Sequence, residues 1–311
     1  MPNPTSKSKS RRALQAKRLQ EAEPVDPVWL VKAIGIALVA ALICAYITFC
    51  LLFYQGQWQL VLHPARTSAA PQSVGGAPYE LIHFGPDESA TPQLTGWWIP
   101  SPPNGRYAGT TLLFLPGANG SLIDDSSTLA TLHGLGINIF AFDYRGYGQS
   151  AAAHPSQQKM THDAEAAWQY LTGSRHIPAS RIVPYGTGVG ASLATHLATT
   201  HTDIAALILD SPSGDLLATA LSDPRSHLVP VRMLFHERFP LALPLSTLRT
   251  PKLLISYTKE SDAVPPAFRT ASDPRITVEM AAHSDASYAQ AIARFLDQYL
   301  PASTPDTSTA R

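Results

Sequence analysis

Apolar residues between positions 79 and 300 fall into two alternating patterns. Short apolar runs are typical of buried strands, and the longer stretches between them carry apolar residues at helical spacing. Because parallel strands need helical crossovers, this alternation predicts an α/β fold, with a mostly parallel sheet and helices on both faces. The predicted strands are 79–84, 94–99, 110–115, 137–142, 181–185, 206–210, 252–257 and 276–280, and the predicted helices lie around 123–133, 161–173, 189–201, 214–221 and 287–299.

A different pattern precedes the α/β part. Residues 33–54 contain no charge, no polar face and a single aliphatic hydroxyl, Thr48. A helix of this length rises about 33 Å, enough to cross a hydrocarbon core of about 30 Å. We therefore predict a transmembrane anchor at 28–54. A cleavable signal peptide is the alternative, but such peptides have apolar regions of about 7–15 residues and a small-residue cleavage site, which is absent after this run. A buried core helix would show a polar face.

The distribution of charge gives the anchor an orientation. Six Lys and Arg residues lie between positions 7 and 18, with no acid among them, whereas only Arg66 follows the apolar run closely. The positive-inside rule then predicts a cytoplasmic N-terminus and a body on the non-cytoplasmic side. We expect four parts: a basic tail at 1–27, the anchor at 28–54, the α/β domain at 55–300 and a polar tail at 301–311.

Three further compositional features limit the possible function classes. Residues 55–311 carry 16 basic and 20 acidic residues, a balance that argues against a nucleic-acid partner. Both cysteines, Cys44 and Cys50, lie in the apolar run, so no disulfide is predicted for the body. The 11 histidines are scattered without metal-ligand spacing, and neither a metal nor a cofactor is implied.

The most informative motif is the segment 185–192, Tyr-Gly-Thr-Gly-Val-Gly-Ala-Ser, which follows a predicted strand and opens a predicted helix. A hydrolytic serine on such a sheet sits in Gly-x-Ser-x-Gly, where flanking glycines permit the sharp turn from strand to helix. Here the central position is Gly188. The motif therefore has the form of a nucleophile turn without the nucleophile.

Ligands of parallel sheets bind at the carboxyl ends of the strands, so the residues that follow each strand are the candidate site. The segment 116–121, Pro-Gly-Ala-Asn-Gly-Ser, could aim the Ala118 N–H at an oxyanion together with the Val189 N–H, although an ordinary turn would have the same sequence. His283 follows the last strand and is a candidate general base. Asp262, or failing that Glu260, could orient its imidazole, but either can be a solvated loop charge.

These motifs together resemble the α/β-hydrolase superfamily, in particular its membrane-anchored, lidless branch near monoacylglycerol lipases and serine aminopeptidases. The resemblance covers about 57–300, and its most specific element is 143–150, Asp-Tyr-Arg-Gly-Tyr-Gly-Gln-Ser, in which Asp143 and Arg145 are expected to pin the loop. Segments 57–64, 207–212 and 282–285 also match. The resemblance implies an eight-stranded α/β-hydrolase fold with nucleophile, acid and base in the order 188, Asp262, His283.

This chain departs from the family pattern at three places. Pro116 stands where the family has His before Gly, Asp262 is one residue displaced from the usual acid position, and Gly188 replaces the serine. Glycine preserves a strained turn but removes the hydroxyl, so we predict a degenerate serine hydrolase, catalytically impaired or non-catalytic. The alternative is an active ester or amide hydrolase that uses activated water or another nucleophile: Thr187, Ser192 or Ser121.

Two other functions remain open. The segment 186–191 also satisfies the G-x-G-x-x-A dinucleotide fingerprint, and Asp210 ends the next predicted strand about twenty residues later. Such a fingerprint normally follows the first strand of its domain, whereas four predicted strands precede this one. The chain could also be a binding protein that uses the crevice for a lipid, acyl or peptide ligand.

Overall fold

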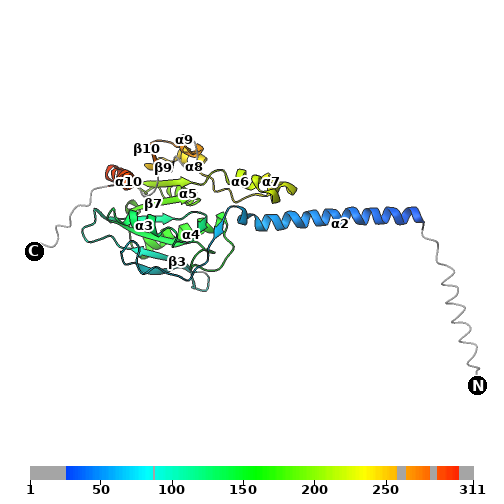
Figure 1. The fold of residues 1–311 in the computed structure, drawn as a ribbon, viewed down its shortest axis with the longest axis horizontal. Helices are drawn as coiled ribbons and strands as arrows, with labels where there is room; N and C mark the ends of the chain where they lie inside the picture. Colours follow the sequence, from blue (N-terminus) through cyan, green and yellow to red (C-terminus); the bar gives the residue numbers. More distant parts are fainter. Residues whose placement is uncertain (1–25, 87, 258–263, 281–285, 301–311) are drawn as a thin grey trace, which may run out of the picture. The chain divides into compact units, whose positions relative to one another are not determined.

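The protein consists of an apolar N-terminal helix and an α/β body (Figure 1). The structure is a computed structural model that describes residues 26–86, 88–257, 264–280 and 286–300. The chain divides into two units, Met1–Phe53 and Tyr54–Arg311. Helix α2, Pro27–Gly56, occupies the described part of the first unit and its last turn enters the second. With a mean hydropathy of 2.7 over its most apolar window, this helix is long and apolar enough to cross a membrane.

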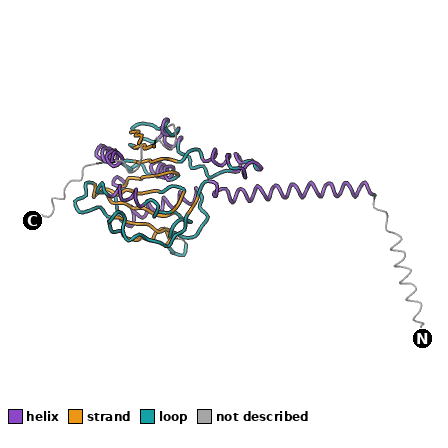
Figure 2. The backbone as a smooth tube through the Cα atoms, viewed as in Figure 1, coloured by secondary structure: helices purple, strands orange, loops and turns teal. Residues whose placement is uncertain are grey.

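The second unit is built on an eight-stranded sheet (Figure 2), in the order β10-β9-β8-β7-β4-β6-β3-β2. Strand β3 pairs antiparallel with β2 and β6, and the other neighbours are parallel. This arrangement confirms the predicted α/β-hydrolase fold. The strands are β2 Glu80–Pro86, β3 Pro92–Ile99, β4 Tyr107–Leu115, β6 Ile137–Asp143, β7 Ile182–Gly188, β8 Leu207–Pro212, β9 Lys252–Tyr257 and β10 Arg275–Met280, and a separate pair joins β1 His63–Pro64 to β5 Asn119–Gly120.

Helices cover both faces of the sheet. Because successive strand residues point to opposite sides, each face has its own apolar side chains, which helices bury. Leu112 and Phe114 pack in one buried cluster with residues of α3 and α10. On the opposite face, Phe84 and Phe140 contact Tyr170, at the end of α4. The helices are α3 Ser126–His133, α4 Gln157–Gln169 with a π turn Tyr170–Ser174, α5 Gly190–Thr200, α6 Leu216–Ser222, α7 Val231–Leu234, α8 Ala242–Thr247, α9 Pro266–Arg269 and α10 Ala286–Tyr299, with 3₁₀ turns at Gln57–Leu60, Ala179–Arg181 and Pro224–Leu228.

The predicted strands all occur, with ends that differ by up to three residues. The difference that affects the site is in β7, which continues past the predicted end at Tyr185 to Gly188. Between β8 and β9 the predicted helix 214–221 appears as α6, whose first turn Asp215 caps by accepting from Leu217 N at 2.9 Å. The short helices α7 and α8 after it were not predicted, because one or two turns are too few to show a helical period.

Candidate functional site

The turn between β7 and α5 has the shape that the sequence predicted for a nucleophile turn. A Cβ at Gly186 would lie 2.7 Å from Ala191 Cα, and a Cβ at Gly190 would lie 2.6 Å from Pro116 O and overlap Leu115 O. Both approaches are to backbone atoms, which cannot rotate away. The two flanking glycines are therefore required by the close packing of α5 against its own strand and the end of β4.

Gly188, between them, is less crowded, because a Cβ built there would approach no atom beyond its own chain neighbours more closely than 3.2 Å. Its φ is +56°, in the left-handed region. A Cβ built there would lie 3.2 Å from Gly117 Cα, 3.5 Å from Ser213 Oγ and 3.9 Å from Ala118 N. The position thus has the strained backbone of an elbow, and a side chain on it would begin close to the Ala118 N and the Ser213 Oγ.

The candidate oxyanion donors lie beside this position. Ala118 follows β4, and its carbonyl oxygen is held by His63 N at 2.8 Å and Tyr147 Oη at 2.9 Å. Val189 is buried and directly precedes α5. Within the part of the chain that the structure describes, neither the Ala118 nor the Val189 N–H donates to a protein acceptor. Two backbone donors next to an elbow are what stabilisation of a carbonyl oxyanion needs.

Ser213, which the sequence pattern did not single out, has its hydroxyl 3.5 Å from the point where a side chain at residue 188 would begin. Thr187 pairs with Asp210 but Gly188 pairs with Pro212, so Ser211 is an extra residue in β8, with φ +42°. A bulge of this kind re-aims the residues that follow it. Ser213 N donates to Gly188 O at 3.1 Å as a result. Its position directly after a strand was the signal that could have found it.

The hydroxyls proposed from sequence as substitutes for the missing serine have other partners or lie elsewhere. Ser192 Oγ donates to Pro240 O at 2.7 Å and is buried. Ser121 is engaged by Asp124, which accepts from Ser121 N at 2.8 Å and from its Oγ at 3.4 Å. Thr187 is half-buried within β7. Ser213 is therefore the better-placed hydroxyl.

The loop 143–150 is held by hydrogen bonds that also fix a neighbouring segment of the site. Asp143 Oδ1 accepts from Leu122 N at 2.8 Å, and Ser150 Oγ donates to Asp143 O at 2.6 Å. Gly148 has φ +43°, and a Cβ on it would overlap the Asp143 carboxylate. Arg145 instead reaches α4, where its Nε lies 2.6 Å from Asp163 Oδ1. Asp143 and Arg145 thus position the loop, and Asp143 also fixes the segment that follows Ala118.

Asp143 gives the site a testable pH dependence. Burial raises the pKa of its carboxyl to about 6, against the opposing effect of hydrogen bonds from Leu122 and Gln149. The folded protein then holds this proton more tightly than the unfolded chain does, so its contribution to stability is present below pH 4 and is lost as pH rises through 6. About two pKa units correspond to about 3 kcal/mol.

Asp143→Asn removes this titration. We expect the free energy of unfolding of the variant, relative to the parent, to rise by about 3 kcal/mol between pH 4 and pH 7. Urea unfolding of the full-length protein in detergent at several pH values measures it, with Asp203→Asn, on an exposed turn, as control. Parallel stability curves for parent and Asp143→Asn would contradict the assignment.

The predicted acid and base lie outside the described residues. Strand β9 ends at Tyr257 and β10 ends at Met280, both on the same edge of the sheet as the elbow, because β7 to β10 are parallel neighbours. Asp262, Glu260 and His283 follow these ends, so their roles stay predictions. Among the described residues, no group of three His, Cys, Asp or Glu side chains could hold a metal ion.

The dinucleotide alternative is not favoured by the position of Asp210. Its side chain is fully buried, and its carboxylate accepts from the hydroxyls of Tyr185, of Tyr257 at 3.4 Å and of Tyr288 at 3.3 Å. A ribose at the loop 186–191 would need an exposed acid. Gly190 is also packed on the end of β4, where a pyrophosphate would have to approach the backbone.

Comparisons with known proteins agree with this geometry. Residues 109–305 match the family of serine aminopeptidases S33. An uncharacterized protein of Mycobacterium tuberculosis is 33% identical over 174 residues, 56% of this chain and 59% of its own. Human alpha/beta hydrolase domain-containing protein 17C is 31% identical over 214 residues, 64% of this chain and 60% of its own. The chain thus spans about three fifths of the length of these curated relatives.

Solved structures show the same fold. The Pyrococcus furiosus esterase Pf2001 superposes with a TM-score of 0.60 at 19% identity, covering 78% of this chain and 98% of that one. A lidless α/β serine hydrolase of Xanthomonas campestris gives 0.51 at 16% identity, covering 76% and 100%. The eight-stranded sheet, the glycine-flanked elbow and the family match over more than half of the sequence lead to one conclusion: this chain belongs to the serine aminopeptidase S33 family of the α/β-hydrolase superfamily.

Proposed function

We propose that this protein is a membrane-anchored α/β-hydrolase family member that has lost serine-nucleophile catalysis and keeps the site to bind a carbonyl ligand, an acyl lipid or a peptide. The observation that carries the proposal is Gly188. It has the backbone of an elbow, φ +56°, and a Cβ on it would lie 3.9 Å from the Ala118 N, but it has no side chain.

The loss of the hydroxyl has a direct chemical consequence. Without an Oγ at this position no acyl-enzyme forms there, and removing a triad serine has cost about 10⁶ in turnover in a protease. Donors such as the Ala118 and Val189 N–H groups can still polarise a bound carbonyl, and such a hole with bound substrate leaves about 10³-fold catalysis over water. Binding is therefore the property that survives. The Pyrococcus furiosus neighbour is named an esterase, and an ester carbonyl is the group we expect the site to bind.

Helix α2 supports the anchoring part of the proposal. It is apolar along its length and contains no acid and a single base, Lys32. The six cations between residues 7 and 18 support a cytoplasmic N-terminus by the positive-inside rule. The body, with Gly188, then lies on the non-cytoplasmic side.

A second function is favoured by one observation, the position of Ser213. Its Oγ lies 3.5 Å from the point where a side chain at residue 188 would begin, next to the same backbone donors. In this alternative the protein is an active ester or amide hydrolase that attacks through Ser213, with the acid and base still to be supplied by the residues that follow β9 and β10.

Labelling of the full-length protein by a fluorophosphonate probe separates the two functions. We expect the parent to stay unlabelled in detergent while its circular dichroism shows it folded, because Gly188 offers no hydroxyl. Labelling that disappears in Ser213→Ala would establish the second function. Labelling that persists in Ser213→Ala would exclude both, and Ser192→Ala and Ser121→Ala would then locate the reactive group.

A further inference from the structure

The segment between β8 and β9 carries the most exposed large apolar side chains of the described part of the body. Met233 is 85% exposed, Leu243 in α8 is 78% exposed and Leu228 is 69% exposed. Leu228 ends the 3₁₀ turn Pro224–Leu228, and Met233 lies within α7, Val231–Leu234, five residues later. Leu228 and Met233 are close in sequence on one short segment, and apolar side chains that gather on a surface mark a site of contact with a partner.

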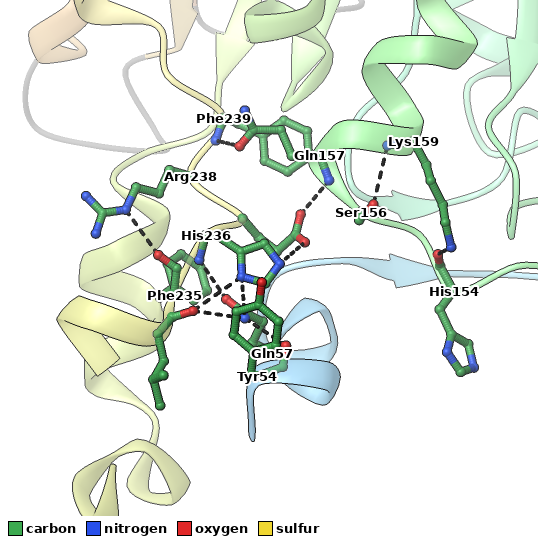
Figure 3. A network of polar contacts seen from close by, with 12 residues as sticks. Tyr54, Gln57, His154, Ser156, Gln157, Lys159, Phe235, His236, Arg238 and Phe239 are labelled. Atoms are coloured by element: carbon green, nitrogen blue, oxygen red, sulfur yellow. Dashed lines mark hydrogen bonds and ion pairs between the residues drawn. The ribbon is translucent and has the colours of Figure 1, made fainter. Parts of the chain in front are cut away.

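This segment is fastened to the residue that follows the apolar helix. Gln57 comes directly after Gly56, the last residue of α2, and its side chain is buried. Its Nε2 donates to Leu234 O at 3.1 Å and to His236 Nδ1 at 2.6 Å, and its Oε1 accepts from His236 N at 2.8 Å (Figure 3). The ring of Tyr54 lies 4.6 Å from that of His236. The side-chain amide of Gln57 thus bonds the backbone carbonyl of Leu234 and the backbone N–H of His236, on either side of Phe235.

The same segment is also tied to the start of α4. Glu237 is buried, accepts from Gln157 N at 2.5 Å and lies 3.3 Å from His236 Nε2. Phe239 N donates to Gln157 Oε1 at 2.8 Å (Figure 3). Since Nδ1 of His236 accepts from Gln57, its Nε2 carries the hydrogen that faces Glu237. Residues 234–239 are held at both ends, so α7 presents Met233 from a fixed position.

Chain length limits how far α7 can lie from the apolar helix. Phe53 is four residues before Gln57, and α2 is helical to Gly56. Four helical residues rise about 6 Å. The headgroup layer on each side of a bilayer is about 5–8 Å thick. A helix that spans the membrane up to Phe53 therefore brings Gln57, with α7 bonded to it, to the outer edge of that layer.

The charge of the segment fits a phospholipid surface. Between residues 224 and 239 there are three arginines and one acid, Glu237, which is buried. Arg225 is paired with Asp223, but Arg232 and Arg238 are exposed, and the guanidinium of Arg238 bonds only to carbonyl oxygens among the described residues. The rest of the body is mildly acidic. Arginines beside exposed apolar side chains are the composition of a surface that binds anionic headgroups.

We propose that Leu228, Met233, Arg232 and Arg238 form a docking face that rests on the surface of the bilayer into which α2 inserts. Docking would give the body one orientation on the membrane. Attachment through α2 alone would leave the orientation of the body unrestricted. The proposal rests on the anchoring proposed above. It is independent of whether the Gly188 site has any activity.

The test places a fluorophore at two positions of the full-length protein. In a Cys44→Ala, Cys50→Ala background, Met233→Cys and Gln298→Cys are labelled with an NBD dye and reconstituted into phosphatidylcholine and phosphatidylglycerol vesicles with or without nitroxide-labelled lipid. Gln298 is the control, because it is exposed on α10, which lies at the end of the body opposite α7 (Figure 1). We expect nitroxide lipid to quench the dye at 233 several-fold more than the dye at 298.

Three outcomes would count against a part of this account, and they are distinguishable. Equal quenching at 233 and 298, in protein that floats with the vesicles after a carbonate wash, would overturn the docking face and leave the anchoring intact. A blue-shifted dye at 233 that nitroxide lipid does not quench, and that shifts back at one protein per vesicle, would assign the face to a second copy. Protein that does not float after the wash would show that the anchoring itself fails.

Discussion

Gly188→Ser is expected to convert a protein that fluorophosphonate leaves unlabelled into one that it labels within minutes. The substitution supplies an Oγ at the least crowded of the three elbow glycines, where a Cβ would lie 3.2 Å from Gly117 Cα and 3.9 Å from the Ala118 N. A residue other than glycine at φ +56° costs about 1–2 kcal/mol, which the fold should tolerate. The gain in hydrolysis of a short-chain p-nitrophenyl ester should be at least ~10²-fold, against the ~10⁶ that a complete triad supplies.

Two control variants distinguish the effect of the new hydroxyl on activity from the effect of the predicted base. Gly188→Ala adds the same backbone strain and the same Cβ without the oxygen, and should stay inactive. His283→Ala in the Gly188→Ser background should abolish the gain, which tests the predicted base directly. A folded Gly188→Ser protein that stays silent would mean that His283 or Asp262 is not in place. Equal activity of parent and Gly188→Ser would overturn the proposal of a disarmed elbow.

Gly190→Ala is expected to destabilise the fold strongly. Helix propensity alone predicts a gain of up to about 1 kcal/mol, because alanine is favoured over glycine in α5. Packing predicts the opposite, since the new Cβ would overlap Leu115 O and lie 2.6 Å from Pro116 O. Backbone atoms cannot rotate away, so overpacking should dominate and cost about 3 kcal/mol or prevent folding.

The measurement is the unfolding midpoint of the full-length protein in urea and detergent. Gly173→Ala is the matched control, because a Cβ at Gly173 would have nothing within 4 Å, and it should change stability by less than about 0.5 kcal/mol. Gly188→Ala provides a contrast: it adds backbone strain and a tight contact at 3.2 Å with Gly117 Cα, but no overlap. A Gly190→Ala protein as stable as the parent would contradict the close packing of α5 on β4.

Local patterns in the sequence determined most of the fold. Buried strands and amphipathic helices have short periods that a window of ten to fifteen residues contains, so the eight strands and five of the helices could be predicted. The motif 143–150 and the glycines at 186, 188 and 190 then identified the superfamily and predicted the loss of a nucleophile hydroxyl at Gly188. The apolar helix α2 could be predicted from the length and composition of its apolar run alone.

The tertiary structure decided which of these residues meet. A bulge at Ser211 brings Ser213 beside Gly188, and the order of strands buries Asp210 between tyrosines, one of them 78 residues away in sequence. Gln57 meets His236 across 179 residues. None of these contacts has a local period, because each depends on strand order and on how loops close over distant segments. The sequence alone therefore determined that a glycine-flanked turn with Gly188 at its centre follows a buried strand, and the fold decided which neighbouring groups surround it.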